Sequence, residues 1–252
     1  MIRRWIESQN SYKALAPFLR NSASRQTTLG QWLADSASQQ MTTLGRWLAE
    51  MPGALEVLDL GCGEGKSIYL FQRVIPSARW RGVDISSSPE VDRRQRHDLP
   101  CETFDGVNLP YANETFDLIY CGQVLEHVRH PDKLMADAAR VLKRGGVFLG
   151  SVSYLEPYHS NSIFNFTPYG LSRVVEDVGL NLLELRPGID APSILMRQIL
   201  GGPRLLNFLF RSSPLHWAIS TAALLTGLPR PLAGFLKIQY CGIFCFLARR
   251  PD

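Results

Sequence analysis

A glycine-rich turn followed by lysine and serine, 57-VLDLGCGEGKS-67, contains the residue types that cradle phosphates in nucleotide-binding loops. Glycines let the backbone approach a ligand closely, and a lysine after them can reach the outer phosphates. The phosphate loop has the spacing GxxxxGK followed by serine or threonine, which would place a glycine where Leu60 stands. The spacing therefore argues against a nucleoside triphosphate site, and we assign Lys66 and Ser67 to the first turn of the following helix.

The turn also departs from the dinucleotide fingerprint GxGxxG, whose third glycine would fall at Lys66. What stands at residues 61–65 is GxGxG, and Asp59 precedes it at the end of a predicted strand. A carboxylate that faces the turn repels a pyrophosphate, but it can hold an ammonium group directly or through water. The turn therefore favours a ligand that carries a cationic amino acid.

Two further acids follow predicted strands along the chain. Asp84 ends the next strand about 20 residues after the turn, where a carboxylate can accept both hydroxyls of a ribose. Asp105 and Gly106, within 102-ETFDGVNLPY-111, are placed for a polar contact at an adenine edge. Each acid alone is more typical of a turn or a helix cap. The ordered set of acids indicates an adenosyl ligand that is cationic.

The elements that must position these acids alternate between strands and helices from residue 54 onward. Alternation of this kind predicts a parallel, doubly wound sheet with right-handed crossovers. The predicted strands are 55–60, 79–85, 116–121, 147–152, 181–187 and a final strand at 238–250, and the predicted helices are 68–75, 131–146 with Gly145 at its end, and 167–179.

In this order, VLDLGCGEG, GVDI, FDGVNLPY, ETFDLIYCGQVLEHV and RVLKRGGVFLGSV resemble the successive motifs of class I S-adenosylmethionine-dependent methyltransferases of the type-11 group. The resemblance covers roughly residues 54–187. It implies an α/β, Rossmann-like sheet of seven strands, mostly parallel with an antiparallel last strand, and S-adenosyl-L-methionine as the cofactor. Carried over by position, the cofactor-binding residues are Asp59, Gly61, Cys62, Gly63, Gly65, Asp84, Ile85, Asp105, Gly106, Cys121 and Gln123.

Two loops after strands supply candidates for the acceptor side, where a base is needed only if the acceptor must lose a proton. The first, 123-QVLEHVRHPD-132, contains His127, which is either a general base or a residue that packs or caps the helix. The second, 152-VSYLEPYHSNSIFNFTPYG-170, contains the other candidates. The predicted catalytic residues are His159, which we favour over His127, and His127, Glu156 and Tyr158.

A metal site is not expected. Some quinone-pathway methyltransferases that the first loop resembles carry an acid where Gln123 stands, and that acid helps to hold a divalent metal. The five cysteines form no CxxC pair, which also argues against structural metal and disulfides.

Three regions follow from the composition. Residues 1–51 are expected to form an N-terminal helical appendage with a tandem repeat, 22–35 and 36–50, which either packs as an arm or covers a ligand as a lid. Residues 52–252 are expected to form the methyltransferase domain. Within it, residues 191–237 are basic and apolar, and they form either an apolar cap or a surface that makes peripheral contact with a membrane.

The whole pattern predicts methyl transfer from S-adenosyl-L-methionine to a small or lipid-linked acceptor, with oxygen as the expected methylated atom. The alternative is a catalytically silent protein that binds S-adenosylmethionine or serves as a scaffold. A net charge of +4 does not favour nucleic acid as a partner. No apolar run follows the basic residues at the start, so we expect no signal peptide and a cytoplasmic location.

Overall fold

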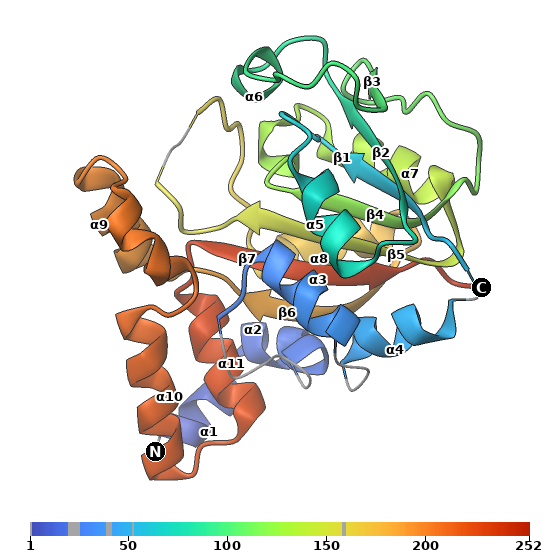
Figure 1. The fold of residues 1–252 in the computed structure, drawn as a ribbon. Helices are drawn as coiled ribbons and strands as arrows, with labels where there is room; N and C mark the ends of the chain where they lie inside the picture. The colour runs from blue at the N-terminus through green and yellow to red at the C-terminus, as the bar shows by residue number, and fades with distance from the viewer. Residues whose placement is uncertain (1, 20–25, 39–41, 52, 158–159) are drawn as a thin grey trace.

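The computed structural model describes residues 2–19, 26–38, 42–51, 53–157 and 160–252, and Figure 1 shows their arrangement. A single sheet of seven strands has the order β3-β2-β1-β4-β5-β7-β6. The strands are β1 (Glu56–Leu60), β2 (Arg79–Asp84), β3 (Cys101–Thr103), β4 (Phe116–Gly122), β5 (Leu142–Ser153), β6 (Asn181–Pro187) and β7 (Ile243–Arg249).

The strand directions match the predicted fold class. β1, β2, β3, β4 and β5 pair in parallel, whereas β7 is antiparallel to both β5 and β6. It follows that β6 runs in the same direction as β5. The carboxyl ends of every strand except β7 therefore lie at one edge of the sheet, which is where open α/β sheets bind ligands.

Helices cover both faces of the sheet, which explains why the strands are apolar without alternation. Successive strand residues point to opposite faces, so Val57 packs in one buried cluster and Leu58 in the other. One face is covered by α3 (Leu29–Ser38), α4 (Thr43–Glu50) and α5 (Ser67–Val74). The other is covered by α1 (Ile2–Ser8), α2 (Asn10–Leu15), η1 (Ala16–Leu19), α7 (Pro131–Val141), α8 (Pro168–Asp177) and α11 (Arg230–Gln239).

The repeated N-terminal segments form the two short helices that their sequences predict, α3 and α4. Thr42 caps α4, since its hydroxyl accepts a 2.9 Å hydrogen bond from the Gly45 amide. The repeated tryptophans are both buried: the Trp47 indole donates a 2.9 Å bond to the Gly145 carbonyl, and the Arg186 guanidinium lies 4.2 Å from the Trp32 ring centre. Residues 22–25 and 39–41 of the repeat lie outside the described residues.

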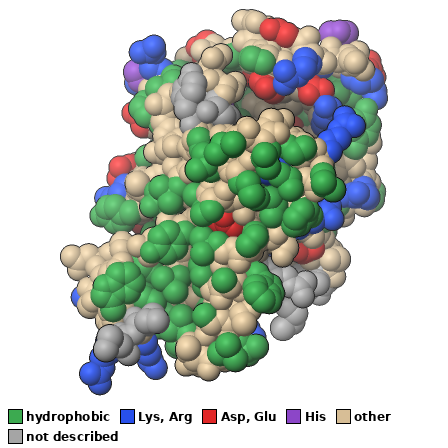
Figure 2. Space-filling view, turned by 90° about the vertical axis from the view of Figure 1, so that its left-hand side faces the viewer, with side chains coloured by type: hydrophobic (Ala, Val, Ile, Leu, Met, Phe, Trp, Pro, Cys, Tyr) green, Lys and Arg blue, Asp and Glu red, His purple; other side chains and the backbone are tan. Residues whose placement is uncertain are grey.

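The stretch after β6 is helical and leaves many apolar side chains exposed. It contains α9 (Ala191–Ile199), η3 (Arg204–Phe210) and α10 (Pro214–Thr226), followed by α11. Hydrophobic side chains gather over the face that α9 and α10 form (Figure 2). Within the described ranges, no helix is both long and apolar enough to cross a membrane.

Two predicted element boundaries are wrong. The helix predicted to end at Gly145 ends at Val141, because Leu142 pairs with Phe116 and already belongs to β5. The final strand begins at Ile243 and not at residue 238, because α11 continues to Gln239 and buries its apolar side against the core. In both places a run of apolar residues fits a helix or a strand equally well, and tertiary packing decides.

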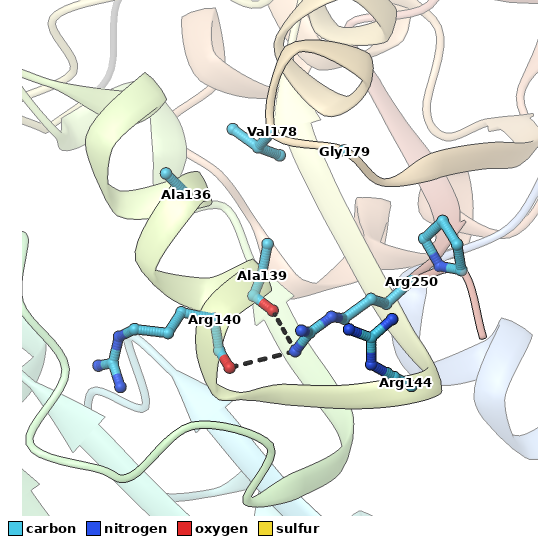
Figure 3. Close-up of a pocket in the computed structure, with 8 residues that line it drawn as sticks. Ala136, Ala139, Arg140, Arg144, Val178, Gly179 and Arg250 are labelled. Carbon is cyan, nitrogen blue, oxygen red and sulfur yellow. Dashed lines mark hydrogen bonds between the residues drawn. The ribbon is translucent and has the colours of Figure 1, made fainter.

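A pocket of about 330 Å³ lies beside the end of α7, at the amino edge of the sheet. Arg250 donates from Nη1 to the carbonyls of Ala139 (3.1 Å) and Arg140 (3.2 Å), as Figure 3 shows, and also to that of Leu142. A cation is favoured at a helix C-terminus, where carbonyls lack partners. The arginines that line this pocket, Arg140, Arg144 and Arg250, are therefore held in structural contacts with Asp137, Glu114 and the end of α7.

Candidate active site

The glycine turn after β1 has a backbone conformation that suits glycine at three positions. Gly61, Gly63 and Gly65 have φ values of +73°, +50° and +76°. A Cβ added at Gly61 would lie 2.3 Å from Cγ2 of Val124, a residue just after β4. The turn is therefore packed against the end of the neighbouring strand, at the carboxyl edge of the sheet.

Asp59 is buried beneath the turn. Burial is the largest cause that raises the pKa of its carboxyl to about 7, and the charge of Asp84 adds to it. The Ser67 hydroxyl donates to Asp59 and in turn accepts a 2.9 Å bond from the Trp80 indole. The sequence predicts only that Ser67 lies in the first turn of the helix, because the spacing does not reveal that its hydroxyl points back to the strand.

Asp84 joins the end of β2 to the turn. Its Oδ2 accepts a 2.6 Å bond from the Gly63 amide and its Oδ1 a 2.8 Å bond from the Ile85 amide, and burial raises its pKa. A carboxylate has about four lone-pair sites, so both oxygens can still accept ligand hydroxyls. Arg94, which the sequence did not single out, donates a 2.8 Å bond from Nε to the Gly63 carbonyl and holds the turn from its outer side.

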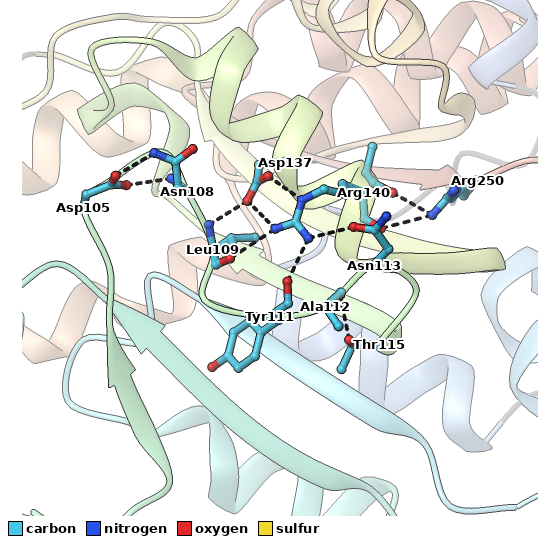
Figure 4. Close-up of polar contacts among 11 residues, drawn as sticks. Asp105, Asn108, Leu109, Tyr111, Ala112, Asn113, Thr115, Asp137, Arg140 and Arg250 are labelled. Carbon is cyan, nitrogen blue, oxygen red and sulfur yellow. Dashed lines mark hydrogen bonds and ion pairs between the residues drawn. The ribbon is translucent and has the colours of Figure 1, made fainter.

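The Asp105 loop is held by its own acid. The exposed Asp105 carboxylate accepts bonds of 2.8 Å from the Val107 amide and of 2.6 Å from both the backbone and side-chain nitrogens of Asn108, and these bonds lower its pKa. Asp137 on α7 accepts a 2.6 Å bond from the Leu109 amide, and Arg140 tightens this junction (Figure 4). Asp105 thus shapes the loop, and its predicted contact with adenine remains a prediction.

Gly106 lies near the Ile85 side chain. A Cβ added at Gly106 would lie 3.7 Å from Cγ2 of Ile85, whose side chain is partly exposed. Cys62 points the other way: its buried sulfur lies 3.9 Å from that of Cys101, and its pKa is raised. Cys62 can therefore offer only its backbone to a ligand.

The end of β4 forms the floor of the site. Cys121 is buried, and burial raises the pKa of its thiol well above the ordinary value, so it is a neutral packing group. Gln123 has a φ of +58°, a conformation that non-glycine residues seldom adopt, and its amide donates a 3.0 Å bond to the Ser151 carbonyl. This strained turn places the Gln123 side chain toward β5, with its Nε2 3.5 Å from the Ser153 hydroxyl.

Two buried glutamates meet at the carboxyl end of β5. The Ser153 hydroxyl lies 3.0 Å from Oε1 of Glu126 and 2.6 Å from Oε2 of Glu156. The Ser153 hydroxyl lies within hydrogen-bond distance of both carboxyl groups, although it can donate its one proton to only one of them at a time. We call Glu126, Ser153 and Glu156 the carboxyl cluster.

The loop after the cluster is attached to it by backbone bonds. The Glu126 carbonyl accepts bonds of 2.6 and 3.0 Å from the amides of Ile163 and Phe164, and the Asn165 side chain donates to the Glu156 carbonyl at 3.0 Å. His127 is half-buried in η2 (Leu125–His127), directly beside Glu126. The other two predicted catalytic residues, Tyr158 and His159, lie outside the described residues.

The structure thus brings most of the predicted cofactor residues to one edge and adds residues that the sequence did not indicate. The additions are Ser67, Arg94, Glu126 and Ser153. Arg94 contacts Gly63 across 31 residues and Ser153 contacts Glu126 across 27, whereas Ser67 contacts Asp59 only eight residues before it. Only Glu126 had a signal in the sequence, its position beside His127. Among the residues that the structure describes, no group of three or more His, Cys, Asp or Glu side chains is arranged to hold a metal ion.

Comparison with known proteins gives a consistent picture for the central part of the chain. The methyltransferase domain family matches residues 58–150. The ubiquinone/menaquinone biosynthesis C-methyltransferase of Desulfotalea psychrophila is 34% identical over 98 residues, 38% of this chain and 40% of that protein. The phthiotriol/phenolphthiotriol dimycocerosates methyltransferase of Mycobacterium tuberculosis is 30% identical over 99 residues, 38% and 37% of the two chains. The matched segment spans about two fifths of these relatives' length.

Solved structures share the fold over most of the chain. A sarcosine dimethylglycine methyltransferase from Galdieria sulphuraria superimposes with a TM-score of 0.56 at 18% identity and covers 88% of this chain and 85% of its own. The cyclase SpnF has a TM-score of 0.52, also at 18% identity, and covers 98% and 96%. At this identity the likeness concerns the fold alone, and the activity must be argued from the site.

Proposed function

We propose that the chain is an S-adenosylmethionine-dependent methyltransferase that transfers a methyl group to a hydroxyl of a small or lipid-linked acceptor, and the match of residues 58–150 to the methyltransferase domain family supports this proposal. The observation that carries the proposal is the convergence of Asp59, the glycine turn and Asp84 at the carboxyl edge of the sheet. When bound, S-adenosyl-L-methionine would supply the methyl group on a positively charged sulfonium sulfur, which leaves as a neutral thioether when the methyl group is transferred.

The residues present fit this cofactor by charge and by shape. Asp59 is a buried carboxyl whose raised pKa reflects burial without a neighbouring cation strong enough to offset it. A ligand ammonium near Asp59 would supply that charge. The turn leaves no room for side chains at Gly61 or Gly65, where an added Cβ would meet Val124 at 2.3 Å and Leu99 at 2.6 Å. A cationic amino-acid group beside Asp59, with ribose hydroxyls at Asp84, suits this arrangement.

On the acceptor side, the chain has to position a nucleophile in line with the methyl group and remove a proton if that nucleophile is a hydroxyl. The carboxyl cluster supports oxygen as the methylated atom, since an unprotonated carboxylate in the pair can accept a hydroxyl proton. Glu156 and His127 are our candidates from the described residues, and Tyr158 and His159 remain candidates from the sequence. Glu126 and Ser153 act as positioning residues for Glu156.

The names of the relatives support the acceptor class. They refer to ubiquinone/menaquinone biosynthesis and to phthiotriol dimycocerosates, so proteins with the same central domain act on small or lipid-linked molecules. One of them is named a C-methyltransferase, and oxygen as the methylated atom therefore rests on the carboxyl cluster of this chain and not on the comparison.

The test uses the purified full chain in two steps. Calorimetry with S-adenosyl-L-methionine should show one binding site, and absence of binding contradicts the proposal. Incubation of cell extract with the protein and methyl-labelled cofactor, followed by partition into aqueous, lipid and macromolecular fractions, should place the label in a small-molecule or lipid product. Label that mass spectrometry or NMR of the product places on carbon or nitrogen would contradict O-methylation alone, and cofactor binding without any labelled product would favour the scaffold alternative.

A further inference from the structure

An exposed apolar surface lies on α9, η3 and α10, beside the carboxyl edge of the sheet. α10 has one buried residue among its 13, His216, whose Nε2 lies 3.2 Å from the Lys237 carbonyl and seats the helix on α11. Its other sides carry apolar residues that face outward, and Leu224 and Leu225 are 83% and 81% exposed. We call the following set the apolar face: Leu195, Met196, Ile199, Leu200, Leu205, Phe208, Trp217, Leu224 and Leu225.

The size of the apolar face requires an explanation. Single exposed leucines are ordinary, but a protein in water seldom leaves a large contiguous patch of them uncovered. Figure 2 shows hydrophobic side chains gathered across this side of the molecule, over the surface that α9 and α10 form. The α10 helix is apolar nearly all round, a composition that in a water-soluble helix is normally covered by other chain segments.

The charges around the apolar face select the kind of partner. Arg204, Arg211 and Arg230 are exposed, and none makes an ion pair with another residue among those described. The sequence has no acidic residue from 191 to 251. Asp190, the nearest acid before α9, is fully buried and accepts a 2.7 Å bond from the Ser193 amide, so it does not offset these arginines at the surface.

α10 is too short to span a lipid bilayer. Thirteen residues make a helix of about 20 Å, whereas the hydrocarbon core of a bilayer is about 30 Å thick. An apolar helix of this length, flanked by Arg211 and Arg230, instead suits the boundary between headgroups and acyl chains. Large apolar side chains there enter the acyl region, and the arginines meet anionic headgroups.

We propose that the apolar face and its arginines dock the protein on an anionic lipid bilayer. The apolar face lies near the acceptor end of the site. Because β6 runs parallel to β5, α9 follows β6 at the same edge of the sheet at which β5 ends with Ser153, close to Glu156. A bilayer on the apolar face therefore lies beside the acceptor end of the site. The proposal concerns a lipid surface as partner and holds whether or not the acceptor is itself a lipid.

The first experiment is flotation of the full chain with phosphatidylcholine vesicles, either pure or containing roughly one third phosphatidylglycerol, at low and at high salt. We expect the protein to float with the anionic vesicles at low salt and to remain mostly in the soluble fraction in the other arms. Protein that stays soluble in every arm, or that floats equally with pure phosphatidylcholine, overturns the proposal.

Variants assign the binding to particular residues. The double variant Leu224→Asp/Leu225→Asp should lower partitioning onto anionic vesicles on the order of a hundredfold, because two side chains no longer enter the acyl region. Tyr69→Asp on α5, a site that is 52% exposed, is the matched control and should bind like the parent protein. Equal binding by the double variant and the parent overturns the assignment to the apolar face.

A second variant tests the contribution of the three arginines. We expect the triple variant Arg204→Gln/Arg211→Gln/Arg230→Gln to bind anionic vesicles on the order of a hundredfold more weakly at low salt, because each arginine is expected to interact with an anionic headgroup. Arg73→Gln on α5 is the control for a general change of charge. The other possible occupant of the apolar face is a second copy of this chain, which sedimentation equilibrium detects as a dimer. A dimer that Leu224→Asp dissociates, together with no flotation, overturns the proposal. Calorimetry with the cofactor on each variant, without vesicles, measures cofactor binding independently of lipid binding. A failure of docking can therefore be distinguished from a failure of the proposed methyl transfer.

Discussion

The backbone amide of Gly63 donates a 2.6 Å hydrogen bond to the Asp84 carboxylate, and this bond fixes the glycine turn after β1 to the end of β2. Two motifs that are 21 residues apart in the sequence thereby become one site. The same carboxylate has oxygens left for ligand hydroxyls, so it both holds the turn and faces the cofactor. This double role makes Asp84 the most direct point at which to test the site.

Asp84→Asn should weaken cofactor binding more than it weakens the fold. The amide keeps one acceptor oxygen for the Gly63 amide but loses the charge and the second acceptor. Charge-assisted hydrogen bonds contribute about 1.5–3 kcal/mol, so we expect calorimetry to show a dissociation constant raised on the order of tenfold to a hundredfold. Asp98→Asn, at an exposed acid paired with Arg96, should leave it unchanged. An unaltered affinity in Asp84→Asn would remove this residue from the site.

The raised pKa of Asp59 predicts how cofactor affinity depends on pH. Near pH 6 the carboxyl is largely protonated, and a cationic ligand must displace that proton, whereas above about pH 7 the carboxylate is already charged. Affinity should therefore rise as pH increases through about 7, and binding at lower pH should release a proton. Calorimetry in buffers of different ionisation enthalpy measures this release directly. Asp59→Asn should abolish it, and the same release in the variant would point to another group.

Stability should depend on Asp59 in the opposite sense. The fold raises the pKa from 3.8 to about 7, so the folded protein holds this proton more tightly than the unfolded chain does. The free energy of unfolding should therefore decrease as pH rises from about 4 to about 7 and then level off, as far as this group contributes. Urea unfolding across this range, compared with Asp59→Asn, isolates the contribution. A variant with the same slope as the parent would contradict the assignment.

Gly61→Ala tests the packing of the turn. An added methyl group would lie 2.3 Å from Val124 at a φ of +73°, so the substitution combines a clash with an unfavourable backbone conformation. We expect about 2–4 kcal/mol of destabilisation in urea unfolding. Gly179→Ala is the matched control, because its φ is +78° but nothing lies within 4 Å of the added methyl, and it should cost about 1 kcal/mol. Equal losses would mean that Val124 can move aside.

Ser153→Ala tests the carboxyl cluster. Without the hydroxyl, Glu126 and Glu156 lose the group that both contact, and we expect about 1–3 kcal/mol of destabilisation with a loss of methyl transfer. Cofactor affinity should not change, because Ser153 lies on the acceptor side. Ser153→Thr, which keeps a hydroxyl, should recover activity at least in part, and Ser77→Ala at an exposed serine is the control. A loss of cofactor binding in Ser153→Ala would contradict the division between the two sides.

The sequence by itself determined the parallel arrangement of the central strands and the positions of the glycine turn and its neighbouring acids. GxGxG after an apolar strand requires backbone conformations that suit glycine, and all three glycines have positive φ. The acids Asp59 and Asp84 follow strands whose carboxyl ends meet because the alternation of elements predicts a parallel sheet. These features are local or follow from topology, so a single sequence carries them.

Only the tertiary structure decided where helices give way to strands and which distant side chains meet. Val141 and Leu142 are both apolar and buried, and the pairing of Leu142 with Phe116 ends α7 there. Glu126 and Ser153 are 27 residues apart, and their contact depends on how β4 and β5 lie together. The exposure of α10 likewise cannot be read from composition, because an apolar helix is equally suited to a core. Burial and long-range contacts are properties of the packed chain, and local spacing does not encode them.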